Sequence, residues 1–284
     1  MSSQIKTGLL LGLLTAIVLL IGQAIGGRSG LMLAFLFAIV MNVGSYWFSD
    51  KIVLAMYRAR ELAPEDAPML HAMVDELAAE ARIPKPRLYV VPQESPNAFA
   101  TGRNPENAVV AVTEGIMHLL SPEELRGVIA HELAHVKNRD ILVQSVAAVL
   151  AGAIVMLANW VKWTAIFGFG RSSDDEGGGN PLAALALAIV APIAATIIQF
   201  AISRSREYLA DETGARISRS PLSLAGALEK LSRGSERVPL HGNQATENMF
   251  IVNPFSGRSM MNLFSTHPPI EERVARLRQM AGRS

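Results

Sequence analysis

Charged and apolar positions divide the chain into two kinds of segment. Four windows contain no Asp, Glu, Lys or Arg: residues 7–27, 29–49, 141–161 and 177–203. Each window is long enough for a helix that crosses a hydrocarbon core of roughly 30 Å, which takes about 20 residues. We therefore predict four transmembrane helices in two hairpins, with a polar segment after each hairpin.

The two predicted hairpins differ in composition. The first window is rich in leucine and is separated from the second by Arg28 alone, which favours a retained hairpin over a cleaved signal peptide. The third and fourth windows contain more alanine, and Pro192 should kink the fourth without excluding it from a membrane. A helical hairpin buried in a soluble core or a membrane groove is the alternative for these two windows.

Lysine and arginine flank the windows unevenly. The positive-inside rule therefore places both termini and both long polar segments in the cytoplasm. The predicted organisation is a transmembrane hairpin (1–50), a catalytic segment (51–140), a second hairpin (141–203) and a C-terminal catalytic segment (204–284). The flanking residues on the cytoplasmic side are Lys6, Lys51, Arg58, Arg60, Lys137, Arg139, Arg204 and Arg206, against Arg28, Lys162 and Arg171 on the other side.

Composition narrows the classes of function. The 194 residues outside the windows carry all 51 charges, so a wholly soluble, disordered or fibrous protein is excluded. A formal net charge of +1 gives no electrostatic case for binding nucleic acid. The chain has no cysteine, which excludes disulfides, thiolate ligands and a cysteine nucleophile. Imidazole and carboxylate groups must therefore hold any metal.

The segment between the second and third windows has the pattern of a mixed α and β domain. An amphipathic helix is predicted at 67–82. Runs of β-branched residues predict strands at 87–91 and 108–113, with a shorter strand at 97–101 between them.

A helix with a strong start carries the candidate chemistry. Ser121 and Glu124 form a capping box, and the helix runs on to the sequence His131-Glu132-Leu-Ala-His135. Histidines four residues apart share one helix face, so both imidazoles can reach one zinc at about 2 Å while Glu132 takes a proton from water. With this composition the motif arises by chance in roughly one chain in a hundred, which disfavours a coincidental surface helix.

A catalytic zinc needs a third protein ligand. Glu207 lies just after the fourth window, and Asp211 follows one helical turn later, where a carboxylate can orient a zinc-bound histidine. The second hairpin leaves and returns to the same membrane face, so it would bring Glu207 to His135. Two alternatives stay open: Glu207 is a surface residue paired with a neighbouring arginine, or Glu212 is the ligand.

Four motifs together resemble the HtpX heat-shock protease family. They are HELAHVKNRD at 131–140, EYLAD at 207–211, NAFATG at 97–102 and THPP at 266–269. Members of this family are bacterial inner-membrane zinc endopeptidases related to the CAAX prenyl proteases. The resemblance implies an α-helical integral membrane protein with four transmembrane helices and a cytoplasmic α+β zinc metallopeptidase domain of the gluzincin-like, HExxH type.

The resemblance also implies roles for individual residues. His131, His135 and Glu207 would hold one Zn²⁺ per subunit, Glu132 would be the general base, and Asp211 would support a ligand. His267 corresponds to a histidine that could stabilise the oxyanion of the tetrahedral intermediate. A helix-entry role before two prolines is the equal alternative for His267, and Arg273 is left as either an assisting or a surface residue.

The short strand would then be the edge strand beside the active-site helix. Extended substrate could pair with it by strand addition, which fixes the backbone and reads sequence loosely. Without the resemblance, a plain hairpin strand would be favoured. The residues expected to bind substrate are Asn97, Ala98, Phe99 and Ala100.

The resulting hypothesis is a membrane-bound zinc endopeptidase that cleaves misfolded or damaged membrane proteins in stress response and protein quality control. Its location would be the bacterial inner membrane, as a multi-pass protein with a cytoplasmic active site. The expected partners are protein substrates, the lipid bilayer and other membrane quality-control proteases. The alternatives are a membrane transporter or channel, and a non-catalytic scaffold stabilised by zinc.

Overall fold

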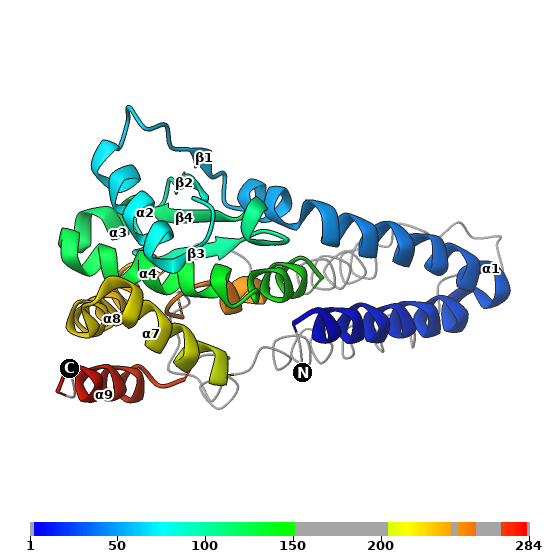
Figure 1. The fold of residues 1–284 in the computed structure, drawn as a ribbon. Coiled ribbons are helices and arrows are strands. Elements are labelled where there is room, and N and C mark those ends of the chain that lie inside the picture. The colour runs from blue at the N-terminus through cyan, green and yellow to red at the C-terminus, as the bar shows by residue number, and fades with distance from the viewer. Residues whose placement is uncertain (1–2, 151–203, 240–243, 254–267, 283–284) are drawn as a thin grey trace.

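The structure is a computed structural model that describes residues 3–150, 204–239, 244–253 and 268–282. Helices and strands keep the labels of Figure 1 throughout. The helices are α1 (Ser3–Met56), α2 (Pro68–Ala81), α3 (Glu114–Leu119), α4 (Pro122–Lys137), α7 (Arg204–Ser218), α8 (Pro221–Arg237) and α9 (Ile270–Ala281), with short 3₁₀ helices η1 (Pro105–Asn107) and η2 (Gln244–Met249).

Residues 3–56 form a helical hairpin. The backbone of α1 leaves helical geometry at Gly26 and Gly27, and the second half of the helix runs back along the first (Figure 1). Asn42 Nδ2 donates a hydrogen bond of 2.8 Å to Thr15 Oγ1 across the two halves. Because side-chain amides are costly to leave unpaired in an apolar environment, this bond stabilises the hairpin.

One helix in the described part of the chain, Gly26–Met56, is long and apolar enough to cross a membrane. A shorter apolar helix, Ile141–Leu150, begins the third charge-free window. The rest of that window and all of the fourth lie outside the described residues, so four spans and the orientation of the chain stay predictions.

The catalytic segment contains one mixed sheet of four strands in the order β1-β2-β4-β3. Strand β2 is parallel to β4, whereas β1 and β3 are antiparallel to their neighbours. The predicted strands at 87–91, 97–101 and 108–113 coincide with β2 (Arg87–Val91), β3 (Ala98–Thr101) and β4 (Val109–Thr113); β1 (Arg60–Glu61) was not predicted. Strand β3 therefore lies at an edge of the sheet, as expected.

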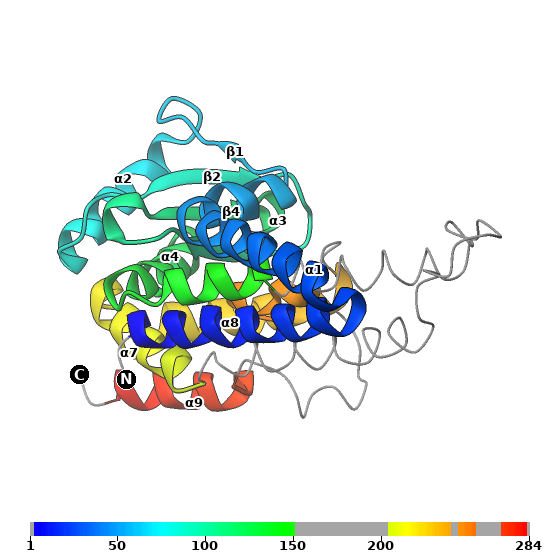
Figure 2. The same ribbon diagram turned by 90° about the vertical axis from the view of Figure 1, so that its right-hand side faces the viewer.

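Helices form successive layers on one side of the sheet. Helix α4 packs directly against β3 and β4, helix α8 packs against α4, and α9 packs against α8 (Figure 2). Val110 and Val112 of β4 join the core that includes Ile129 and Leu133 of α4. The apolar face of α4 thus packs on the sheet and fixes the position of the helix that carries His131 and His135.

The opposite face of the sheet is covered by the end of the hairpin. Val53 and Leu54 of α1, with Tyr57 just after it, pack with Val109 of β4 and Phe99 of β3 in a second buried cluster. The hairpin helix therefore continues beyond residue 50 and becomes part of the core of the catalytic segment.

The capping box predicted at the start of α4 is present. Ser121 Oγ accepts a bond from the Glu124 amide, and Glu124 Oε2 accepts one from the Ser121 amide. Further along this helix, Gly127 faces the backbone of α8: a Cβ added there would lie 2.8 Å from the Leu224 nitrogen. The absence of a side chain at Gly127 lets the two helices approach.

Replacing Gly127 with alanine should therefore destabilise the fold. Alanine gains about 1 kcal/mol of helix propensity, but the overlap with the α8 backbone should cost roughly 1–3 kcal/mol more than that gain. Denaturant unfolding in detergent checks this, with Gly226→Ala as the matched control, since its Cβ would meet only the Glu124 side chain at 3.3 Å. Equal stability of the two variants would contradict the close approach.

Candidate metal centre

Helix α4 places His131 and His135 one turn apart, and α7 brings Glu207 against them. The Nε2 atoms of the two histidines are 3.2 Å apart. Glu207 Oε2 lies 3.7 Å from His131 Nε2, and Glu207 Oε1 lies 3.6 Å from His135 Nε2. All three side chains are buried. The structure thus brings together the three ligands expected from the sequence.

These distances fit a metal ion. Ligands about 2 Å from a tetrahedral zinc are separated from one another by roughly 3.3 Å. The three candidate ligand atoms all lie within 4.8 Å of one another. Two imidazole nitrogens that face each other beside a carboxylate form a donor set that suits a divalent cation.

The position of Glu207 depends on a close approach of α7 to α4. A Cβ added at Gly214 would lie 2.8 Å from His131 Cα, so glycine allows α7 to lie directly on the helix that carries the histidines. Glu212, the competing ligand, instead pairs with Arg216 and is about half exposed. The described part of the chain therefore presents Glu207, and not Glu212, to the histidines.

Each histidine has a carboxylate at its other ring nitrogen. Asp211 Oδ1 lies 3.0 Å from His131 Nδ1, as the spacing from Glu207 led us to expect. Asp140 Oδ1 lies 3.1 Å from His135 Nδ1. Such pairs fix the tautomer and the orientation of a metal-binding imidazole. Asp140 was missed as a functional residue in the sequence, although it lies inside one of the four motifs.

Arg273 of α9 lies in the interior, where it holds Asp211 beside the candidate metal ligands, and not at the surface. Its side chain is fully buried, and its Nε and Nη2 donate bonds of 2.8 and 2.7 Å to the two oxygens of Asp211. Its Nη1 donates to the carbonyl of Ile251 at 2.8 Å and lies 3.7 Å from Glu207 Oε2. A signal was available in the sequence, since Arg273 shares the apolar stripe of α9 with Val274 and Leu277.

The electrostatics of the centre follow from burial and from these pairs. Burial raises the pKa of Asp211, but Arg273 outweighs burial and holds that pKa below its ordinary value. Burial alone would lower the pKa of His135, yet Asp140 and Glu207 overcome it and raise that pKa to about 10. For His131 burial dominates, and its pKa is lowered. Because a metal binds the neutral imidazole, a bound cation would favour the neutral form of His135, against the effect of Asp140 and Glu207.

Glu132 is held between the centre and the edge strand. It is 1% exposed, and burial raises its pKa to about 7. The nearby His135 acts in the opposite direction, as does a hydrogen bond from the backbone of Ala100 on β3. A carboxyl group with this pKa is suited to accept and return a proton near neutrality.

The residues expected to bind substrate divide between the two faces and the edge of the sheet. Ala98 and Ala100 join the core beneath α4, whereas Phe99 points to the opposite face. Asn97, just before β3, donates from Nδ2 to the carbonyl of Val252. His267 lies outside the described residues.

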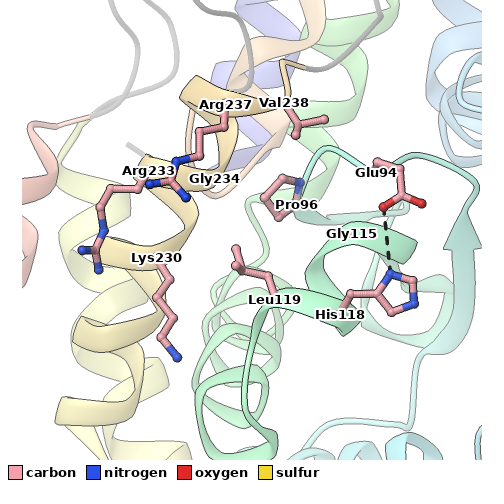
Figure 3. Close-up of a pocket in the computed structure, with 10 residues that line it drawn as sticks. All are labelled: Glu94, Pro96, Gly115, His118, Leu119, Lys230, Arg233, Gly234, Arg237 and Val238. Atoms are coloured by element: carbon pink, nitrogen blue, oxygen red, sulfur yellow. Dashed lines mark ion pairs between the residues drawn. The ribbon is translucent and has the colours of Figure 1, made fainter.

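A groove of about 500 Å³ lies between α3 and α8. Neither His131 nor His135 lines it. Figure 3 shows basic side chains of α8 on one wall and Pro96 with α3 on the other. Among the basic residues, Lys230 pairs with Glu124 at 2.7 Å. The residues that line this groove are Glu94, Pro96, Gly115, His118, Leu119, Lys230, Arg233, Gly234, Arg237 and Val238.

The fold and the buried histidine–glutamate group together define a metallopeptidase. The chain belongs to peptidase family M48, whose model matches residues 64–281. Membership of a peptidase family implies that its substrates are peptides or proteins.

Curated relatives cover almost the whole chain. A protein named "Protease HtpX homolog" from Syntrophobacter fumaroxidans is 62% identical over 282 residues, which are 99% of this chain and 100% of that protein. Proteins with the same name from Persephonella marina and Pyrococcus furiosus are 60% and 56% identical, over 98% of this chain and 98% and 96% of their own lengths. The resemblance to the HtpX family is thereby confirmed.

A solved structure supports the fold. The crystal structure of S. mikatae Ste24p superposes with a TM-score of 0.51 at 17% identity. The match covers 94% of this chain and 62% of that chain. At this identity the likeness concerns the fold alone.

Replacing Asp140 with alanine should weaken zinc binding. Loss of the carboxylate at Nδ1 leaves His135 unoriented, and such changes typically cost 10- to 100-fold in metal affinity. Competition with a chelating dye measures the dissociation constant, and Asp75→Ala is the control because its carboxylate is exposed and pairs with Lys85 at 2.7 Å. An unchanged zinc affinity in Asp140→Ala would show that Asp140 does not support the ligand.

Proposed function

We propose that this protein is a membrane-bound zinc endopeptidase. One observation carries the proposal: Glu132 is buried between a group of three metal ligands and the edge strand β3. Zinc is the ion that suits two imidazoles, one carboxylate and an open fourth position. When bound, it would supply Lewis-acid chemistry, lowering the pKa of a water molecule to about 7 and polarising a peptide carbonyl.

The chain's own residues would do the rest of the work. His131, His135 and Glu207 hold the ion, and Asp211 and Asp140 orient the two imidazoles. Glu132 accepts the proton of the attacking water and then delivers it to the leaving amine. His267 is proposed to stabilise the oxyanion, as the resemblance implies.

The edge strand would hold the substrate. An extended peptide that pairs with β3 lies beside Glu132, because the Ala100 backbone is within hydrogen-bond reach of that carboxylate. Backbone pairing is indifferent to most side chains, which suits a protease for unfolded segments. Asn97 to Ala100 are proposed as this binding edge.

The proposed setting is protein quality control at the bacterial inner membrane. The second half of α1, Gly26–Met56, is long and apolar enough to cross a membrane, and its end packs directly on the sheet. The substrates would be misfolded or damaged membrane proteins, cleaved on the cytoplasmic side under stress, alongside other quality-control proteases. No finding favours a transporter or channel. A zinc-stabilised scaffold would leave a buried Glu132 without a role.

Replacing Glu132 with glutamine tests the mechanism. The change keeps the shape of the side chain and removes the base, so zinc content should stay at one ion per chain while cleavage of an unfolded casein substrate falls by at least about 100-fold. Zinc content is measured by atomic emission and cleavage by gel assay, with and without a chelator.

The matched control is Glu123→Gln, which changes an exposed carboxylate on the first turn of the same helix. Its activity should equal that of the unmodified protein. Full activity in Glu132→Gln, or activity that survives complete removal of zinc, would overturn the proposed function.

A further inference from the structure

We infer that Ile251 closes part of the substrate-binding edge, so that a substrate backbone can pair with β3 at Ala100 but not at Ala98. This inference rests on the proposed function, because it concerns how the same edge reads its substrate. It makes Ile251 a residue that determines specificity, by limiting the stretch of substrate that the enzyme holds.

The register of the sheet shows which backbone groups face outward. The Thr113 amide of β4 donates to the carbonyl of Asn97, and Ala98 lies opposite Val112 in the antiparallel pair. Because backbone groups alternate in direction along a strand, Ala98 and Ala100 turn their N–H and C=O groups away from β4. These two residues are the ones that a strand added at the edge would use.

Both outward groups of Ala98 are already bonded within the chain. The Ile251 amide donates to the Ala98 carbonyl at 3.3 Å. The Ala98 amide donates to Asn97 Oδ1 at 3.1 Å, and the same Asn97 side chain donates to the Val252 carbonyl at 3.0 Å. Residues 251 and 252 therefore lie along this part of the edge and occupy the hydrogen-bonding groups that a substrate strand would use.

The covering segment is firmly held. Phe250, Ile251 and Val252 are each at most 2% exposed. The Ile251 carbonyl accepts the bond from Arg273, the residue that also supports Asp211. The Phe250 ring meets the rings of Tyr57 and Phe99 at 5.3 and 5.5 Å between centroids. Displacing this segment would break the aromatic cluster and uncouple a support of the metal centre.

Ala100 is in a different situation. Its amide also bonds within the chain, to the carboxylate of Glu132, so it adjoins the catalytic residue itself. Within the described ranges, however, no backbone amide from outside the sheet bonds to the Ala100 carbonyl, which can therefore accept a bond from a substrate amide. Ala98 lies about 7 Å further along the strand. Pro96, which lines the groove between α3 and α8, directly precedes Asn97 and the covered end of β3. In the direction of Ala98, backbone pairing between substrate and β3 should therefore end within two substrate residues of the residue that pairs with Ala100.

Substrates with single N-methylated amides test this limit. Each backbone amide of an unfolded model peptide is methylated in turn, and kcat/KM is measured with the zinc-loaded full chain. In the unmodified protein, methylation two residues from the amide that pairs with Ala100 should have no effect. In Phe250→Ala, which removes the ring that holds the covering segment against Tyr57 and Phe99, the segment can leave Ala98, and the same methylation should lower kcat/KM by about five-fold relative to the unmethylated peptide in that variant. Ile251→Val, which keeps the amide, should show the unmodified profile.

Hydrogen exchange at the Ile251 amide tests whether Ala98 stays covered, without relying on activity or on a variant of the covering segment. In Glu132→Gln loaded with zinc, the Ile251 amide should stay protected when the peptide binds, with binding followed by fluorescence anisotropy. Loss of that protection would overturn the inference. So would a fall in kcat/KM of the unmodified protein when the peptide is methylated two residues from the amide that pairs with Ala100. In either case proteolysis itself would persist, so the proposed function would stand. An unmodified protein that cleaves no peptide at all would instead overturn the proposed function.

Discussion

The buried ion pair between Arg273 and Asp211 is the interaction on which the rest of the structure depends. A charge in a protein interior is costly unless it is paired and hydrogen-bonded, and removing one partner of such a pair typically costs about 3–5 kcal/mol. Here the pair has two bonds between its partners, a third to the Ile251 carbonyl, and contact with His131 and Glu207. One guanidinium thus connects α9, α7 and the segment beside the edge strand to the metal centre.

The sheet separates two tasks between its faces. The face under α4 holds the core that supports the histidines, whereas the other face packs on the end of the membrane hairpin. Strand β3 belongs to both, because Ala98 and Ala100 point to one face and Phe99 to the other. A movement of the α1 hairpin would therefore act on β3 more directly than on the histidines of α4.

Local features of the sequence predicted α2, α4 and three of the strands in the described catalytic segment, and the grouping of His131, His135 and Glu207. The helix that carries His131 and His135 follows from a capping box and an apolar face, and three strands follow from β-branched runs. Glu207 was predicted from topology, because a membrane hairpin returns the chain to its starting face. The apolar stripe of α9 could have placed Arg273 in the interior, but its partner could not be predicted, because it depends on packing between segments far apart. The partner of Asp140 depends likewise on the rotation of a helix end. The cover at Ala98 depends likewise on a contact across more than 150 residues.

The order in which the centre is built along the chain has a biosynthetic consequence. His131 and His135 come before the second predicted hairpin, Glu207 and Asp211 come after it, and Arg273 comes later still. During translation the ion-binding group stays incomplete until residue 207 has been made, and its charges stay uncompensated until residue 273 follows. The metal-binding side chains can therefore come together only after most of the chain has been synthesised.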